Sequence, residues 1–228
     1  MKKLPQSQKI PRSGATLFRR VGKVGWKKSE HFTYTYAFPA LRRWLVAQVP
    51  PQQRILSIGC GTGELEKLLG KQAELVVGID LFLEMVRSAR RHGVIHLVQT
   101  NSHFLPFASE CFDTVVLPET LGYVDPAVAL RESARVLKKD GQVLITTYPV
   151  HLVAHSVYRK RSAADVALAL VHAGFSVVEC HFLLLKHFKV QEIDDERRCS
   201  LLYLLAQKHD YRTVLTPARR IHSNPSRG

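Results

Sequence analysis

Paired cysteines and long apolar runs are both missing from this sequence. The four cysteines lie far apart with no CxxC pair, which argues against a zinc ribbon and against a disulfide scaffold. No apolar run reaches the roughly eighteen residues that a membrane-spanning helix needs, and no apolar signal-peptide core follows Met1. We therefore expect a soluble, cytoplasmic protein without a transmembrane segment.

Acidic residues are scarce at both ends of the chain. The formal net charge of +14 divides into +10 over residues 1–50, −1 over residues 51–150 and +5 over residues 151–228. This distribution indicates a neutral body with cationic arms of the kind that contact RNA or another anionic surface. An Arg-rich, acid-poor start also suits a mitochondrial presequence, but Pro5 and Pro11 weaken the amphipathic helix that such a signal needs.

The overall composition is that of a globular protein. Hydrophobic residues make up 46% and charged residues 23% of the 228 residues, and this length predicts one domain with its own core. Changes in composition predict a basic flexible arm over residues 1–25 and an aromatic, helical lid over residues 26–50. The main domain is expected over residues 51–208, followed by a basic tail over residues 209–228.

Strand and helix patterns alternate through the main domain. Short apolar runs predict strands at 54–58, 75–79, 95–98, 114–117 and 142–147. Helices are expected at 64–69, 84–91 and 127–137, the last closed by Lys138, Lys139 and Gly141. After a helix at 162–173, two successive strands at 176–185 and 200–206 predict an antiparallel hairpin. The expected fold class is therefore α/β, with seven strands that are mostly parallel and covered by helices on both faces.

A glycine-rich turn follows the first predicted strand. Gly59, Gly61 and Gly63 allow a sharp turn and a close approach of a ligand to the N-terminus of the next helix. Asp80 ends the second predicted strand, where α/β sheets present a carboxylate to ribose hydroxyls. The spacing is GxGxG instead of the dinucleotide pattern GxGxxG, and no GxxxxGK[ST] phosphate loop is present. The pattern favours an adenosyl ligand without phosphates.

Five ordered segments resemble the class I S-adenosylmethionine-dependent methyltransferases, in particular the group that acts on small molecules. The segments are RILSIGCGTGELE, VVGIDLFLEMVRSAR, HLVQTNSHFLPFASECFDTVV, LRESARVLKKDGQVLIT, and HAGFSVVE with LLYLLAQK. The resemblance covers about residues 54–208. It implies a Rossmann-like, doubly wound sheet that ends in a C-terminal antiparallel hairpin, and S-adenosylmethionine as the cofactor.

The resemblance also implies a set of cofactor-binding residues and no metal ligand. Asp80 is expected to bind the ribose, with Leu81 and Met85 beside the adenine. The full expected set is Gly59, Cys60, Gly61, Gly63, Asp80, Leu81, Met85, Asn101, Ser102 and Pro118.

Two positions depart from the family pattern. Ser57 stands where the family commonly has Asp or Glu two residues before the first glycine, and Asn101 stands where it has an acid before Leu-Pro-Phe. Ser57 can still orient the turn through a hydrogen bond, and Asn101 can still accept one from an adenine amino group. Both changes remove negative charge from around a cationic sulfonium, so we expect weaker cofactor binding.

No catalytic residue is assigned from the sequence. Methyl transfer is an in-line displacement at an activated carbon, so the protein mainly aligns the reactants and excludes water. Glu119, after the fourth predicted strand, is a candidate general base, although residues there more often cap a turn or rim the pocket. His103 is interpreted as packing or surface, the commoner state of a histidine near a site.

The expected function is methyl transfer to an O, N or C nucleophile of a small or lipid-like molecule. The chain lacks the [ND]PP[YF] motif of amino-methyltransferases that act on nucleic acids, and the Pro-Cys or Thr-Cys pair of cytosine-C5 enzymes. Two alternatives stay open: an RNA- or ribosome-directed methyltransferase that uses the basic N-terminal arm, and a non-catalytic S-adenosylmethionine-binding scaffold. The sequence does not indicate the oligomeric state.

Overall fold

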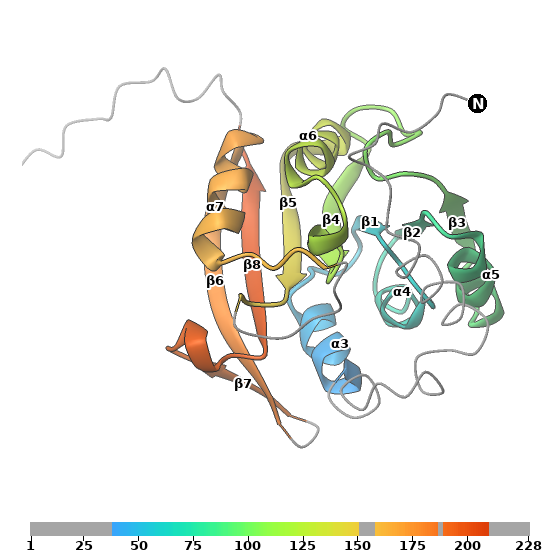
Figure 1. The fold of residues 1–228 in the computed structure, drawn as a ribbon. Helices are drawn as coiled ribbons and strands as arrows, with labels where there is room; N and C mark the ends of the chain where they lie inside the picture. Colours follow the sequence, from blue (N-terminus) through green and yellow to red (C-terminus); the bar gives the residue numbers. More distant parts are fainter. Residues whose placement is uncertain (1–37, 151–157, 187–188, 210–228) are drawn as a thin grey trace, which may run out of the picture.

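The computed structural model describes residues 38–150, 158–186 and 189–209 (Figure 1). The predicted arm, residues 26–37 of the predicted lid and the tail from residue 210 lie outside these ranges. The strands are β1 (Arg54–Ile58), β2 (Leu75–Asp80), β3 (His96–Gln99), β4 (Phe112–Pro118), β5 (Leu137–Thr147), β6 (Phe175–Lys186), β7 (Lys189–Ile193) and β8 (Leu201–Lys208). The helices are α3 (Phe38–Ala47), α4 (Glu64–Leu69), α5 (Leu83–Arg91), α6 (Pro126–Val136) and α7 (Ala163–His172), with short 3-10 helices η3 (Leu121–Tyr123) and η4 (Glu196–Arg198).

The strands form one sheet in the order β3-β2-β1-β4-β5-β8-β6-β7. Strands β1 to β5 pair in parallel, whereas β8 runs antiparallel to both β5 and β6. The Rossmann-like α/β class and the antiparallel C-terminal strands are therefore confirmed.

The sheet has eight strands, so the expected number of seven was wrong. The additional strand is β7, which pairs antiparallel with β6 at the edge of the sheet. Its sequence, KVQEI, is mostly exposed or half-buried and carries two charged residues. An edge strand with little to bury shows no clear apolar alternation, so the sequence pattern did not indicate it.

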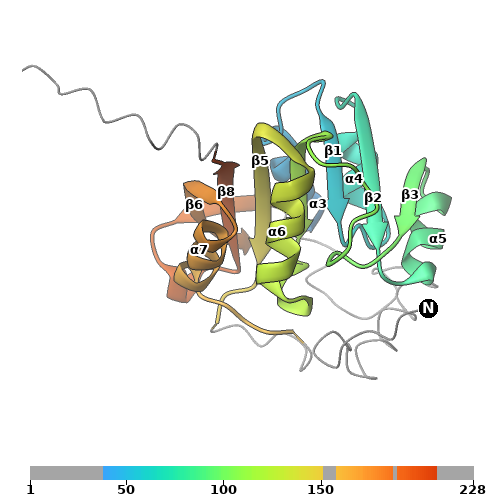
Figure 2. The same cartoon turned by 90° about the horizontal axis from the view of Figure 1, so that it is seen from above.

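Side chains on alternate sides of the strands build two cores, as the pleat of a sheet requires. On one face, Leu56 and Leu117 pack with the apolar residues of α6 and α7. On the other face, Ile55 and Val116 pack with α3 and α4. Figure 2 shows these two helix pairs on opposite sides of the sheet. Full burial of each such side chain contributes about 1.5–3 kcal/mol, so both helix layers are firmly held.

Helix α3 is the described part of the segment predicted as a lid. Its residues Phe38, Leu41 and Leu45 are buried in the core shared with α4. The ring of Trp44 packs edge-to-face against Tyr203 of β8, with 4.8 Å between ring centroids. This helix is therefore anchored to the sheet and forms a fixed wall of the molecule.

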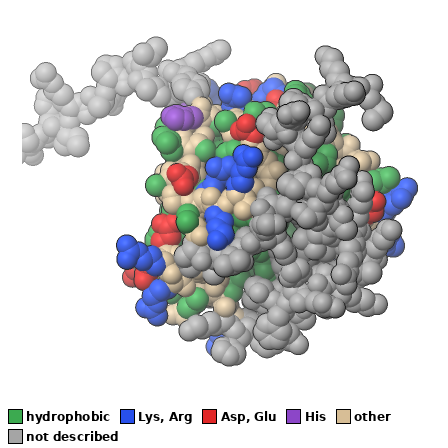
Figure 3. All heavy atoms as spheres, viewed as in Figure 1, with side chains coloured by type: hydrophobic (Ala, Val, Ile, Leu, Met, Phe, Trp, Pro, Cys, Tyr) green, Lys and Arg blue, Asp and Glu red, His purple; other side chains and the backbone are tan. Residues whose placement is uncertain are grey.

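The described surface carries charges of both signs. Figure 3 shows one face, on which Lys and Arg side chains lie among acidic and apolar ones. None of the helices that the structure describes is long and apolar enough to cross a membrane.

Candidate functional site

One pocket lies at the carboxyl ends of strands β1 to β4. Its walls come from the glycine turn after β1, the residues after β2 and β3, the start of the β4–α6 connection, and α3. In open α/β sheets, ligands bind at this edge, where the strand order changes direction next to β1. The fold therefore brings five segments that are separate in sequence to one cavity.

The glycine turn has a backbone that other residues would not tolerate. Gly59 has φ 78°, and a Cβ there would lie 2.1 Å from Oγ1 of Thr120. Gly63 has φ 87°, and a Cβ there would lie 2.8 Å from the Cβ of Ala89 in α5. The turn is also tied to β2, because the N–H groups of Gly59 and Cys60 both donate to the carbonyl of Ile79 at 2.9 Å. Glycine is required for both the backbone conformation and the close packing.

Asp80 lies at the end of β2 and braces the turn. Its Oδ2 accepts the Gly61 N–H at 3.0 Å and its Oδ1 accepts the Phe82 N–H at 2.9 Å. Burial raises the pKa of Asp80 to about 6, although these backbone hydrogen bonds oppose the rise. A carboxylate oxygen has room for a further donor, so both oxygens are fixed and can still accept from ligand hydroxyls.

A second carboxyl, which is buried, lies beside the turn. Glu66 of α4 is 2% exposed and lines the pocket. Its Oε1 accepts the hydroxyl of Ser57 at 2.5 Å, whereas its Oε2 is buried without a hydrogen-bond partner among the described residues. Burial raises the pKa of Glu66 to about 7, against the opposing effects of Ser57 and the charge of Arg42.

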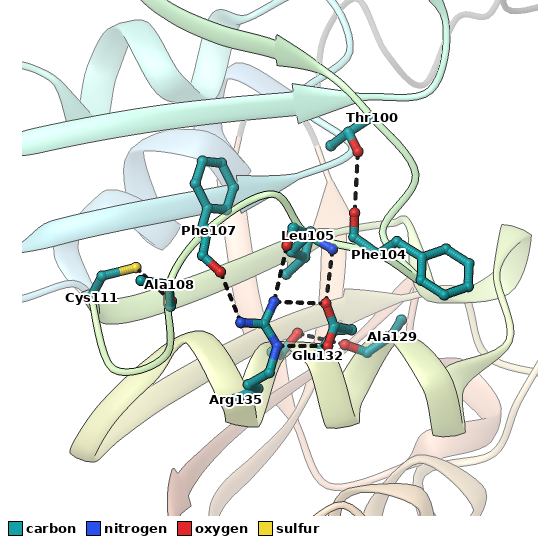
Figure 4. Close-up of polar contacts among 10 residues, drawn as sticks. Thr100, Phe104, Leu105, Phe107, Ala108, Cys111, Ala129, Glu132 and Arg135 are labelled. Atoms are coloured by element: carbon teal, nitrogen blue, oxygen red, sulfur yellow. Dashed lines mark hydrogen bonds and ion pairs between the residues drawn. The ribbon is translucent and has the colours of Figure 1, made fainter. Parts of the chain in front are cut away.

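The loop after β3 carries Asn101 and Ser102 and is clamped to α6 (Figure 4). The guanidinium of Arg135 donates to the carbonyls of Leu105 and Phe107 at 3.0 and 2.8 Å. Glu132 accepts the Leu105 N–H at 2.8 Å and pairs with Arg135. These charge-assisted bonds hold the loop against a rigid helix, and so fix the adenine side of the expected site.

His103 follows on the same loop and is 4% exposed. Its Nε2 accepts the Asp125 N–H at 3.1 Å, so the neutral ring carries its proton on Nδ1. That nitrogen is buried with no hydrogen-bond partner within the described ranges. Burial lowers the pKa of His103, although the charge of Asp125 and the hydrogen bond to its backbone oppose the decrease. The lowered pKa favours the neutral ring. Of the two states considered for this histidine, packing and surface, its burial agrees with packing, and the residue also lines the pocket.

Glu119 lines the pocket after β4 in a left-handed backbone conformation, with φ 50°. Its Oε1 accepts the hydroxyl of Thr146 at 2.6 Å, and its N–H donates to the Thr146 carbonyl at 2.9 Å. Burial raises the pKa of Glu119 to about 7. A carboxyl held in this way changes protonation close to neutral pH.

The structure brings together nearly all of the predicted site residues. Every member of the set lines the pocket except Gly63, which lies at the N-terminus of α4. The sequence did not indicate the pocket residues Glu66 of α4 or Phe38, Leu41 and Arg42 of α3. An acid on the apolar side of a short helix was the one available signal for Glu66. No cluster of metal-ligating side chains occurs in residues 38–150, 158–186 and 189–209.

The sheet order, the glycine turn and the acid that ends β2 define a Rossmann-like protein with an adenosyl-type site. The family model of the methyltransferase domain matches residues 56–145. Over these residues the chain matches the methyltransferase domain family, and its fold is that of class I S-adenosylmethionine-dependent methyltransferases. That family implies S-adenosylmethionine as the cofactor, and the carboxyls of Glu66 and Asp80, which line the pocket, suit a cationic ligand that bears a ribose.

Curated relatives match part of the chain. Demethylmenaquinone methyltransferase from Corynebacterium kroppenstedtii is 33% identical over 123 residues, which cover 51% of this chain and 53% of the relative. Ubiquinone biosynthesis O-methyltransferase from Xanthomonas oryzae is 33% identical over 129 residues, 54% of this chain and 49% of the relative. An uncharacterized protein from Methanocaldococcus jannaschii is 38% identical over 98 residues, 42% of this chain and 38% of the relative. The chain thus matches about half or less of the length of these relatives.

Solved structures share the fold over most of the chain. An S-adenosylmethionine-dependent methyltransferase from Thermotoga maritima has a TM-score of 0.69 at 22% identity, covering 85% of this chain and 99% of its own. The [4+2]-cyclase SpnF has a TM-score of 0.70 at 17% identity, covering 91% of this chain and 99% of its own. At these identities the likeness concerns the fold, and one of the two structures is named for a reaction other than methyl transfer.

Proposed function

We propose that this chain binds S-adenosylmethionine in the pocket and transfers its methyl group to an O, N or C nucleophile of a small or lipid-like molecule. The single observation that carries this proposal is Asp80, a half-buried carboxylate at the end of β2 that is held in place by hydrogen bonds to the glycine turn and to the Phe82 N–H. That arrangement presents acceptors for ribose hydroxyls beside a backbone that a ligand can approach closely.

The remaining pocket residues are assigned to different parts of the cofactor. Leu81 and Met85 supply apolar surface for the adenine, and the clamped loop presents Asn101 and Ser102 to its edge. The turn residues Gly59, Cys60 and Gly61 line the part of the pocket next to Glu66, and Pro118 lines the part next to Glu119. When bound, the cofactor supplies a methyl group on a sulfonium, which is already a strong electrophile.

Glu119 is the residue best placed to take a proton from the acceptor. It lines the pocket and is held by Thr146, and its pKa of about 7 matches the range in which a general base works well at neutral pH. A hydroxyl acceptor loses a proton during methylation, whereas a carbanion or a free amine has its electron pair available. Glu119 therefore matters most if the acceptor is a protonated hydroxyl.

The relatives support a small, lipid-like acceptor. Two of them are named for methylation of demethylmenaquinone and for ubiquinone biosynthesis. The RNA-directed alternative depends on the basic N-terminal arm, residues 1–25, which lies outside the described ranges. The scaffold alternative depends on the departures at Ser57 and Asn101. Neither alternative has a supporting contact in the described pocket.

Calorimetric titration tests cofactor binding. We expect S-adenosylmethionine and S-adenosylhomocysteine to bind the wild-type protein saturably, and Asp80→Ala to lose about 1.5–3 kcal/mol of binding free energy. Asp194→Ala, which removes an exposed acid after β7, should bind like wild type and serves as the control. Failure of both ligands to bind folded wild-type protein at millimolar concentration would refute the proposal.

Turnover separates the three functional hypotheses. Formation of S-adenosylhomocysteine is measured with a panel of quinols, phenols and amines, and separately with RNA. Product formed only with the small acceptors supports the proposed enzyme, and product formed only with RNA supports the alternative. Tight cofactor binding without turnover on any acceptor would favour the scaffold.

A further inference from the structure

The serine that replaces the family's acid is hydrogen-bonded to an acid from another element. Ser57 lies on β1 and is completely buried, and its hydroxyl donates to Glu66 on α4 at 2.5 Å. The negative charge that residue 57 does not supply is thus present, carried by a helix residue that lines the same pocket. The expectation of weaker cofactor binding considered residues 57 and 101 and did not include this carboxyl.

The two oxygens of the Glu66 carboxyl differ in their hydrogen bonds to the described residues. Its Oε2 is buried without a hydrogen-bond partner in the described residues, and no ion pair to Glu66 occurs there either. The charge of Arg42 acts on it, but the guanidinium of Arg42 forms its ion pair with Glu64, at 3.6 Å. A buried carboxylate without a counter-ion is costly, so a cation that enters the pocket would be stabilised there.

We propose that Glu66, held by Ser57, accepts the α-ammonium group of S-adenosylmethionine and thereby selects ligands that carry an amino-acid end. This inference rests on the proposed function and assigns one residue of its site. The ammonium suits an unpartnered acceptor because it offers three N–H donors, whereas a sulfonium offers none. The ribose already has its expected acceptor in Asp80, at the end of the neighbouring strand β2.

A pair of ligands isolates this contact. S-Adenosylhomocysteine carries the amino-acid end, whereas 5′-methylthioadenosine has the same adenosine and thioether without it. We expect Glu66→Gln to weaken S-adenosylhomocysteine about tenfold or more, and to change the affinity for 5′-methylthioadenosine less than about twofold. Glu74→Gln, the same substitution at an exposed acid paired with Arg54, should alter neither affinity.

The outcomes are distinct. Equal weakening of both ligands would show that Glu66 only supports the turn, and an unchanged affinity for S-adenosylhomocysteine would show that it contacts no ammonium; either result overturns the inference while the proposed function stands. If neither ligand binds the wild-type protein, the proposed function fails and this inference fails with it. Thermal denaturation confirms that the variant is folded.

A measurement on the wild-type protein keeps the inference testable if the variant does not fold. Glu66 faces Ser57 on β1, Cys60 in the turn, Glu64 on its own helix and Arg42 on α3. Because an ammonium favours the ionised carboxyl, binding of S-adenosylhomocysteine at pH 7 should release protons, detected by calorimetry in buffers of different ionisation enthalpy. Both ligands are expected to contact Asp80 and both lack the sulfonium, so neither feature distinguishes them. Because 5′-methylthioadenosine has no ammonium to favour the ionised Glu66, its binding should release fewer protons. Equal release overturns the inference.

Discussion

The two ends of the parallel strands differ in how their acids are paired. At the amino ends, Asp113 accepts the Arg54 N–H at 2.9 Å and the Lys138 ammonium at 2.8 Å. Burial opposes the effect, but these donors hold the pKa of Asp113 below its ordinary value. At the carboxyl ends, the donors to Asp80 and Glu119 among the described residues are backbone N–H and hydroxyl groups, and burial raises the pKa values of both acids.

This difference separates structural charge from charge available to a ligand. An acid that already has a cationic partner contributes to the fold and has little left for binding. An acid buried without one destabilises the ligand-free protein and is stabilised when a ligand brings donors or a positive charge. The contrast between the two ends can be tested by disturbing each of them separately.

The largest effect is expected from Gly59→Ala at the carboxyl end. The new Cβ would meet Thr120 at 2.1 Å in a backbone with φ 78°, so the turn must shift. We expect binding of S-adenosylhomocysteine to fall below detection and the free energy of unfolding to drop by about 1–3 kcal/mol.

Gly93→Ala is the matched control for that substitution. Gly93 also has a positive φ, of 93°, but a Cβ there would meet nothing within 4 Å. This variant should lose about 1–2 kcal/mol of folding stability from backbone strain and keep its affinity for S-adenosylhomocysteine. Equal loss of binding in both variants, measured by titration calorimetry, would show that strain alone disables the turn and that the contact with Thr120 is irrelevant.

The second effect is a fall in stability of the ligand-free protein as the pH rises from about 5 to 8. Glu66 and Glu119 have pKa values raised to about 7, and Asp80 to about 6, by burial. In this window the folded state holds more protons than the unfolded state, so the free energy of unfolding decreases with pH. The stabilisation is complete below the unfolded pKa values and is lost as the pH passes the folded ones.

Chemical denaturation at several pH values measures this slope. The lowered pKa of His103 acts in the opposite direction as the pH falls below the ordinary histidine value of 6.5, and it reduces the slope there. Glu119→Gln should flatten the slope by up to about 1.4 kcal/mol per pH unit, the value for one titrating group. An unchanged slope in this variant would show that Glu119 is ionised throughout, like the paired acids at the amino ends.

The same contrast explains what the sequence could predict. The glycine turn and Asp80 were predictable because their signals are local: three glycines after a strand, and an acid at the end of the next one. The position of Glu66 in the site was not predictable, because its meaning depends on Ser57, nine residues away on a strand. Local patterns identify elements and turns, whereas the partners of buried polar groups are set by tertiary packing.

Lys138 shows the same limit at the amino end. The sequence placed Lys138, Lys139 and Gly141 at the end of a helix, but α6 ends at Val136 and β5 already begins at Leu137. The early residues of β5 are held by a parallel partner, because Leu137 pairs with Phe112 of β4, and by the contact of Lys138 with Asp113. These contacts join residues about 25 positions apart, and they override the local preference for a basic helix end.

The smallest effect is expected from Lys138→Met, which disturbs only the amino end. The Lys138 and Asp113 side chains are 42% and 28% exposed, so their ion pair is screened by solvent and is worth about 0.5–1 kcal/mol. We expect the free energy of unfolding to fall by that amount in low salt and by less in 0.5 M salt (about 4 Å screening length). Affinity for S-adenosylhomocysteine should not change, because Asp113 lies at the opposite end of β4 from Pro118. A loss of affinity comparable with that of Asp80→Ala would show that the two ends of the sheet are coupled, and that the charges at the amino end also shape the pocket.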